Sequence, residues 1–398
     1  MTKQEFKQYC SKRVHILDGA MGTQLQKHGM PKGVKPEAWV LENPDVVRKI
    51  QNEYIAAGSD IIYAPTFGAN AVKLADSSLA DNVREANARI ASLSRSVAGD
   101  KILVGGDISP LGVLLDSSKG YTFDDCVNIY KEQIEGLIEG GVDFLALETF
   151  IDIEEARAAA IAARETCPDL ALTVTFAFDG NGRLLTGADA LTALFTMADA
   201  GADAIGANCG VGPGAMLGVI RQMAEYAAVP LIAKPNAGLP KTDENGDTYF
   251  DMSVTDFCLH VPDFAAHGVA LIGGCCGTAP EYIAGIKAAL DGCCISAPAG
   301  KNVHPLTSPR TTVFVDDSTE YSEPIDLASG DTDDLIDEVL DASDADVIRL
   351  TYNGAADDID IAAVISVICS MVRQPLAFDF ADETLLARAK RLYCGIAG

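Results

Sequence analysis

A strand, a loop and a helix follow one another in residues 143–166, which read DFLALETFIDIEEARAAAIAARET. The short apolar run at 143–147 predicts a buried strand, and the amphipathic stretch at 153–166 predicts a helix. A second strand is expected at 170–176, LALTVTF. Strands that alternate with helices pair in parallel through right-handed crossovers. This stretch therefore predicts a parallel α/β sheet.

The same unit occurs eight times before residue 300. The other strands are expected at 14–17, 60–64, 101–105, 204–207, 230–233 and 269–272, and further helices at 44–57, 123–139 and 280–290. Eight units fit a closed (β/α)8 barrel, the TIM barrel of about 250 residues, better than an open doubly wound sheet. The carboxyl ends of the strands then share one mouth, where barrel enzymes carry their catalytic residues.

Composition narrows the class of protein. The 398 residues include 57 acidic and 30 basic side chains, and the net charge of −27 opposes binding to nucleic acid or anionic lipid. The amino terminus lacks the apolar core of a signal peptide, and no stretch has the ~18 apolar residues of a membrane span. Eleven cysteines without a disulfide framework suit a reducing compartment. We therefore expect a cytoplasmic protein without a membrane segment.

Three of the eleven cysteines follow expected strands. Cys209 comes after the sixth strand, and the adjacent pair Cys275 and Cys276 comes after the eighth. Thiolates suit zinc better than magnesium or calcium, and a zinc site with three protein ligands leaves one position for substrate. Free cysteine often only fills a core, but the six single cysteines lie away from the strand ends, and we regard Cys293-Cys294 as incidental. The pattern predicts an open zinc site at the mouth.

Acidic and small residues occupy other expected strand ends. Asp18 and the Gly19–Gly22 loop follow the first strand, and Glu148 follows the fourth. The backbone N–H groups of such a glycine-containing loop can receive a carboxylate. Aspartate is common in turns, so a structural role in the turn before Gly19 is the alternative for Asp18. For Asp107, a structural role and a substrate-binding role both stay open.

Six motifs resemble those of the homocysteine S-methyltransferase domain over about residues 13–297. They are LDGAMGTQL at 17–25, TFGAN at 66–70, ET at 148–149, NCG at 208–210, PNAGLP at 235–240 and GGCCGT at 273–278. The PNAGLP run is most similar to the form of this domain at the amino-terminal end of cobalamin-dependent methionine synthases. The resemblance implies a (β/α)8 barrel and zinc-dependent methylation of homocysteine to methionine.

The resemblance also implies roles for individual residues. Cys209, Cys275 and Cys276 are expected to bind the zinc ion and to act in catalysis through it. A zinc-bound thiol is deprotonated, which makes the homocysteine sulfur a nucleophile toward a methyl group. Asp18 and Glu148 are expected to hold the substrate ammonium group. The backbone at Gly19, Ala20 and Met21 is expected to receive its carboxylate.

The methyl donor stays open among several alternatives. The chain lacks the Asp-x-His-x-x-Gly motif that anchors cobalamin, so methylcobalamin is expected on a separate corrinoid protein. A rival within the family takes the methyl group directly from betaine or S-methylmethionine. A more distant rival is a zinc-binding interaction subunit without catalysis, which the retention of Asp18, Glu148 and the three cysteines disfavours.

The remaining residues predict a small second unit. We divide the chain into a zinc-binding barrel at 1–300 and, at 301–398, a linker with a small acidic α/β segment. Residues 298–310 read as the linker, and 316–344 as an acidic run. Strands are expected at 347–351 and 376–380, and helices at 359–373 and 384–393. This part faintly resembles the opening of a pterin-binding barrel, in a degenerate or truncated form.

Overall fold

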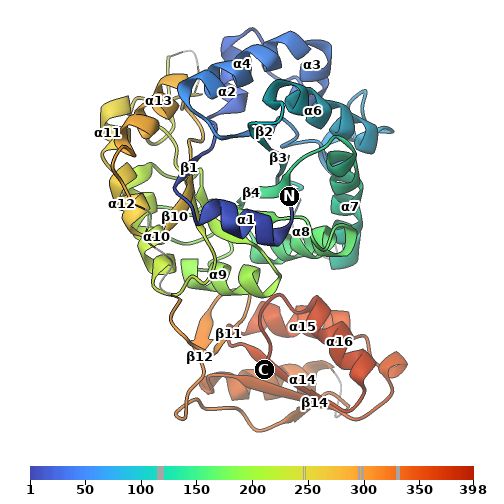
Figure 1. Ribbon diagram of the computed structural model, residues 1–398. Coiled ribbons are helices and arrows are strands. Elements are labelled where there is room, and N and C mark those ends of the chain that lie inside the picture. Colours follow the sequence, from blue (N-terminus) through green and yellow to red (C-terminus); the bar gives the residue numbers. More distant parts are fainter. Residues whose placement is uncertain (114–120, 245, 247, 295, 297–299, 329–331) are drawn as a thin grey trace.

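Eight parallel strands form one sheet that is nearly closed into a barrel, with helices around it (Figure 1). This computed structural model describes residues 1–113, 121–244, 246, 248–294, 296, 300–328 and 332–398. Neighbouring strands follow the order β1-β10-β7-β6-β5-β4-β3-β2, and each hydrogen-bonded pair is parallel. The prediction of an α/β fold of the TIM-barrel type is confirmed.

The barrel strands lie within a few residues of their predicted positions. They are β1 His15–Ile16, β2 Ile61–Ala64, β3 Leu103–Ile108, β4 Phe144–Phe150, β5 Leu172–Phe176, β6 Ala204–Asn208, β7 Leu231–Lys234 and β10 Val269–Ile272. β3 and β4 run further than predicted. Asp107 and Glu148 therefore lie within these strands rather than in the loops after them. Asn208 is the last residue of β6, so the strand backbone fixes the position of all three residues.

Helices follow the strands around the outside of the barrel. They are α2 Met21–Lys27, α3 Pro36–Glu42, α4 Pro44–Ala57, α5 Ala71–Leu74, α6 Val83–Ala98, α7 Phe123–Glu139, α8 Ile153–Thr166, α9 Ala190–Asp199, α10 Pro213–Ala224, α11 Val254–Cys258, α12 Val261–Ala266 and α13 Pro280–Ala289. The predicted bounds of α4, α7 and α8 agree with the structure. A short hairpin, β8 Lys241–Thr242 with β9 Thr248–Tyr249, follows β7.

The amino-terminal end of the barrel is covered by α1, Lys3–Cys10 (Figure 1). The Met1 ammonium group donates to the Asp143 carbonyl at 2.8 Å, next to the start of β4. Phe6 and Cys10 pack on Leu17, Phe144 and other apolar side chains of the barrel interior. Because this end is filled by apolar residues, the carboxyl ends of the strands form the mouth available for chemistry.

The C-terminal residues fold against one side of the barrel, beside α9 (Figure 1). They contain the antiparallel pair β11 Pro305–Thr307 and β12 Thr312–Phe314, and the parallel sheet β13 Ile325–Asp326, β14 Ile348–Tyr352 and β15 Leu376–Phe380. The helices are α14 Thr332–Asp341, α15 Ile361–Met371 and α16 Glu383–Leu392, with one-turn 3-10 helices at Ala342–Asp344 and Ala356–Asp358. These residues, from 300 to 398, are called the C-terminal unit below.

The C-terminal unit contains more secondary structure than the sequence predicts. The four elements predicted beyond residue 346 are present, but the linker contains β11 and the acidic run contains β13 and α14. Residues 298–299 of the predicted linker and 329–331 of the acidic run lie outside the described residues. The unit has its own apolar core between the sheet and the helices, which includes Ile348, Ile365 and Phe378. Within the described part of the chain, no helix is long and apolar enough to cross a membrane.

Candidate active site at the barrel mouth

Three cysteine sulfur atoms lie together at the mouth of the barrel. Cys209 directly follows β6, and Cys275 and Cys276 follow β10, with all three Sγ atoms within 4.8 Å of one another. The Sγ atoms of Cys209 and Cys276 are 4.0 Å apart. Tetrahedral zinc with Zn–S bonds of about 2.3 Å separates two sulfur ligands by about 3.8 Å. The donor set and its spacing therefore fit zinc, and the zinc ligand roles stay a prediction.

The backbone beside the sulfur cluster adopts an unfavourable conformation at two residues. Cys209 has φ of 57° and Thr149, at the end of β4, has φ of 64°. A positive φ is uncommon for residues other than glycine, and a β-branched residue such as threonine rarely adopts it. Each such residue costs about 1–3 kcal/mol and persists only where surrounding contacts hold it. Asn208 contacts the backbone of Thr149, and the Cys209 N–H donates to the Lys234 carbonyl at 3.1 Å.

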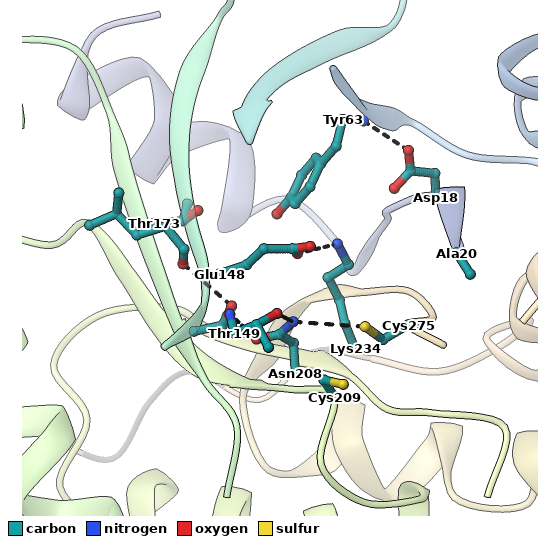
Figure 2. Close-up of polar contacts among 12 residues, drawn as sticks. Asp18, Ala20, Tyr63, Glu148, Thr149, Thr173, Asn208, Cys209, Lys234 and Cys275 are labelled. Carbon is teal, nitrogen blue, oxygen red and sulfur yellow. Dashed lines mark hydrogen bonds and ion pairs between the residues drawn. The ribbon is translucent and has the colours of Figure 1, made fainter. Parts of the chain in front are cut away.

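Asn208 connects the end of β4 to the sulfur cluster. Its Oδ1 accepts the Thr149 N–H at 2.7 Å, and its Nδ2 donates to Thr149 Oγ1 at 2.7 Å. The same Nδ2 lies 3.8 Å from Cys275 Sγ (Figure 2). The side chain is fully buried. Asn208 thus joins the end of β4 to the loop that carries Cys275.

The three thiols share protons unevenly. The pKa of Cys209 is lowered, because the thiols of Cys275 and Cys276 donate hydrogen bonds to its sulfur. The pKa of Cys275 is raised, and that of Cys276 is raised to about 12, because each thiol donates to the Cys209 sulfur and is also buried. A cation that binds all three sulfurs would have to displace the protons of the thiols whose pKa is raised.

A buried ion pair stands beside the sulfur cluster. Lys234, the last residue of β7, places Nζ 2.6 Å from Glu148 Oε2 and 3.8 Å from the centre of the Tyr63 ring (Figure 2). Lys234 is 3% exposed and Glu148 is 8% exposed. Burial opposes the charge on Lys234, but Glu148 and nearby acidic groups outweigh it and raise the pKa of the lysine.

Sequence reasoning did not identify Lys234 as part of the site. The residue directly precedes Pro235, the first residue of the PNAGLP motif, at the predicted end of the seventh strand. A charged residue at a barrel strand end is the signal that would have found it. Its partner Glu148 is 86 residues away in the chain, so the pairing itself is not visible in the sequence.

Two further carboxylates reach the same buried region. Asp18 Oδ2 accepts the Tyr63 N–H at 2.8 Å and so bridges β1 and β2, while its Oδ1 has no hydrogen-bond partner among the described residues. Burial raises the pKa of Asp18 to about 7 although Lys234 opposes the shift. Asp107 Oδ1 is also buried and has no partner in the part of the chain that the structure describes, and burial with the charge of Glu148 raises the pKa of Asp107. Unpartnered buried oxygens are costly, which suits a site that receives a cationic group.

The loop after β1 differs in part from its predicted role. Ala20 is the N-cap residue of α2, and its N–H donates to Thr278 Oγ1 at 3.1 Å. A Cβ atom at Gly19 would lie 2.8 Å from the same Oγ1, which explains the glycine. The Ala20 amide is therefore already engaged. The amides of Met21, Gly22 and Thr23, in the first turn of α2, lack partners inside the helix and can donate to a carboxylate, as can the Gly19 amide before the helix.

Residues 15–290 match the family model of homocysteine S-methyltransferases. The chain is 31% identical over 285 residues to the methionine synthases of Mycobacterium leprae and Mycobacterium tuberculosis, an alignment that covers 67% of this chain. The chain spans only 24% of the length of these relatives.

A solved structure shares the fold. The metallated form of the homocysteine methyltransferase MmuM from Escherichia coli superposes with a TM-score of 0.59 at 24% identity, over 70% of this chain and 96% of that one. Similarity at this level of identity supports the barrel fold.

Proposed function

This chain belongs to the homocysteine S-methyltransferase family and is a methyltransferase, and on that premise we propose that it methylates the sulfur atom of homocysteine. The observation that carries the proposal is the juxtaposition at one barrel mouth of three cysteine sulfurs and a buried group of carboxylates. The sulfurs suit a thiol-activating metal, and the carboxylates suit an amino-acid ammonium group. A substrate that is both a thiol and an amino acid satisfies both.

We propose that Cys209, Cys275 and Cys276 hold a zinc ion. Zinc bound by three thiolates keeps one coordination position open and stabilises a substrate thiol in its nucleophilic thiolate form. The protein supplies the placement of these ligands. Asn208 supports this placement because it joins the left-handed Thr149 backbone to the Cys275 sulfur.

The buried carboxylates provide the proposed site for the substrate ammonium group. The unpartnered Oδ1 of Asp18 supports this role, since it lies buried in the same region as Glu148. Lys234 already pairs with Glu148, so an entering ammonium group shares that carboxylate with the lysine. Of the predicted backbone donors, the amides of Gly19 and Met21 remain proposed for the substrate carboxylate, and the neighbouring Gly22 amide is added to them.

We propose methylcobalamin on a separate corrinoid protein as the methyl donor. The methionine synthase relatives support this donor, although the chain spans about a quarter of their length. Exposed apolar side chains on loops after different strands also suit a protein partner at the mouth; they are Phe67 after β2, Leu185 after β5 and Leu239 after β7. Scattered exposed apolar residues are common on protein surfaces, so the main support for this donor is the similarity to methionine synthases.

We also propose that the chain divides into two domains near residue 300 and that the protein is cytoplasmic. The separate apolar core of the C-terminal unit supports a boundary near residue 300 between a zinc-binding barrel and a small unit like the opening of a pterin-binding barrel. All eleven cysteines are free, which agrees with a cytoplasmic location.

The test combines metal analysis with donor comparison. Purified chain is expected to contain one zinc ion and to methylate homocysteine when a methylcobalamin-loaded corrinoid protein is supplied, with betaine and S-methylmethionine as the rival donors. Cys275→Ala is expected to lose both the metal and the activity. Cys294→Ala, an exposed cysteine outside the cluster, is the matched control and should retain both. A Cys275→Ala protein that keeps zinc and activity would rule the proposal out.

A further inference from the structure

Three arginine side chains line one cavity between the barrel and the C-terminal unit. The cavity has a volume of about 600 Å³, and its charged and hydroxyl-bearing lining residues are Arg183, Arg310, Arg373, Asp189, Thr186 and Thr311. The chain as a whole has a net charge of −27. A cavity whose lining carries three cations and one anion is therefore opposite in sign to the rest of the molecule.

The lining residues come from three separate segments. Arg183 and Thr186 lie in the loop between β5 and α9, Arg310 lies between β11 and β12, and Arg373 lies between α15 and β15. Ser308 fixes two of these segments, since its Oγ donates to the Arg373 carbonyl at 2.5 Å and accepts the Arg310 N–H at 3.1 Å. The cavity is thus built jointly by the barrel and the C-terminal unit.

Two pairs of hydroxyl groups join α9 of the barrel to β11 and β12 of the C-terminal unit. Thr192 Oγ1 on α9 lies 3.1 Å from Thr312 Oγ1 on β12, and Thr196 Oγ1 lies 2.8 Å from Thr307 Oγ1 on β11. The second pair is fully buried. These contacts hold the arginine-bearing segments at a defined separation.

The arginines have few partners of their own. Arg183 Nη1 donates to the Gly187 carbonyl at 3.2 Å and lies 3.4 Å from Asp189 Oδ2. Arg310 Nη1 makes a long contact of 3.5 Å with the Ser370 carbonyl. Within the described residues, the Arg373 guanidinium makes no hydrogen bond or ion pair. Three guanidinium groups and one carboxylate line the cavity, so two positive charges are uncompensated within the lining.

We propose that this cavity binds a phosphate group, either as inorganic phosphate or as part of a small organic phosphate. Guanidinium groups present forked donors that match phosphate oxygens and form strong charge-assisted hydrogen bonds. A phosphate group with a charge of about −2 neutralises the two uncompensated charges. The volume lies within the range of about 300–1,000 Å³ that is typical of small-molecule sites. A bound phosphate would join the barrel to the C-terminal unit and stabilise their contact.

The test measures phosphate binding to the full chain by calorimetry and thermal unfolding. Inorganic phosphate, adenosine monophosphate and adenosine are the probes, in a phosphate-free buffer with ionic strength held constant by sodium chloride. At least one of the two phosphates is expected to bind and to raise the unfolding temperature, and adenosine is not. Tighter binding of adenosine monophosphate identifies an organic phosphate site, and equal binding identifies an inorganic one.

Variants tie the binding to the cavity. Arg373→Met and Arg310→Met are each expected to weaken phosphate binding about tenfold or more, as the loss of one charge-assisted contact does. Arg388→Met, an exposed arginine on α16 outside the cavity, is the matched control and should bind as the wild type does. Arg183→Met replaces either variant if that variant fails to fold by circular dichroism.

Three results would overturn the proposal. They are no binding of either phosphate, unchanged affinity in the variants, and adenosine binding as tightly as adenosine monophosphate. None of these readouts depends on zinc or on methyl transfer, so the phosphate site and the proposed methyltransferase function fail separately.

Discussion

The barrel and the C-terminal unit are both built from alternating strands and helices, but they differ in whether charged residues at their strand ends are buried. Both alternate parallel strands with helices, and both have apolar cores. In the barrel, the ends of β4 and β7 bury Glu148 and Lys234 as an ion pair. In the C-terminal unit, Asp379 near the end of β15 is exposed.

The difference follows from closure of the sheet. Eight strands nearly close the barrel, so their carboxyl ends face one another across the mouth and shield polar side chains from water. The three strands β13, β14 and β15 form an open sheet, and their ends do not converge. Local sequence patterns that look alike therefore give a chemical site in one region and a solvated edge in the other.

The largest effect is expected when the buried pair at the mouth is broken. Lys234→Met leaves the Glu148 carboxylate buried without its cation, and such a loss destabilises a protein by about 3–5 kcal/mol. Urea denaturation at neutral pH measures the free energy of unfolding. The double variant Lys234→Met/Glu148→Gln is expected to recover much of the loss, because no charge is then left unpaired.

Asp379→Asn is the matched change at the open sheet. An exposed carboxylate without a described partner is expected to change stability by about 0.5 kcal/mol or less. Equal effects of Lys234→Met and Asp379→Asn would mean that closure of the barrel does not set the cost of charge at the strand ends.

A smaller effect is expected where the two regions meet. Arg157 on α8 is 8% exposed and donates to the carbonyls of Arg391 and, at 2.8 Å, of Lys390 at the end of α16. Arg157→Ala removes these bonds and is expected to lower the local stability of α16 by about 1–3 kcal/mol. Hydrogen exchange should then show faster exchange of the α16 amides with unchanged exchange in the barrel strands.

The control at this contact is Arg388→Ala, because Arg388 lies exposed on the same helix. It should leave the exchange of α16 unchanged. If Arg157→Ala instead accelerates exchange equally in the barrel and in α16, the two regions unfold as one unit and the proposed boundary near residue 300 is wrong.

A different kind of effect is expected in the pH dependence of the free energy of unfolding. Glu155, in the first turn of α8, accepts the Leu111 N–H at 2.5 Å and the Tyr130 hydroxyl at 2.9 Å. Burial raises its pKa from 4.5 to about 7, and these two bonds only partly oppose the shift. The folded state therefore binds a proton that the unfolded state releases between about pH 4.5 and about pH 7.

The sign follows from this difference in proton binding. The Glu155 contribution is fully present below the unfolded pKa and is lost as the pH rises through the folded pKa, by at most about 1.4 kcal/mol per pH unit. Glu155→Gln should therefore become more stable relative to wild type as the pH rises from 5 to 8 in thermal unfolding, whatever the other groups contribute. Glu383→Gln, an exposed change of the same type in the first turn of α16, is the matched control. A constant difference between Glu155→Gln and wild type across this range would contradict the shifted pKa.

Much of the fold was accessible from the sequence because its signals are local. Apolar strands and amphipathic helices have different periods, so α4, α7 and α8 were predicted at their observed bounds. β13 was missed, because it has only two residues, Ile325–Asp326, and lies in an acidic stretch. A strand this short has no periodicity of its own and exists through its pairing with β14.

The candidate site was accessible in part. Placing Cys209, Cys275 and Cys276 after strands six and eight predicted that they would meet, and the structure brings their sulfurs together. The pairing of Lys234 with Glu148 and the engagement of the Ala20 amide by Thr278 were not predicted. Both contacts join residues that are far apart in the chain.

The sequence by itself determined the order of strands and helices, the number of units in the barrel and the strand ends that carry cysteines and acids. These features depend on the periodicity and type of neighbouring residues. Only the tertiary structure decided which charges are buried, which oxygens lack partners and where three arginines meet. Burial and long-range pairing depend on how the sheet closes and on what packs across it, and no short segment of the chain contains that information.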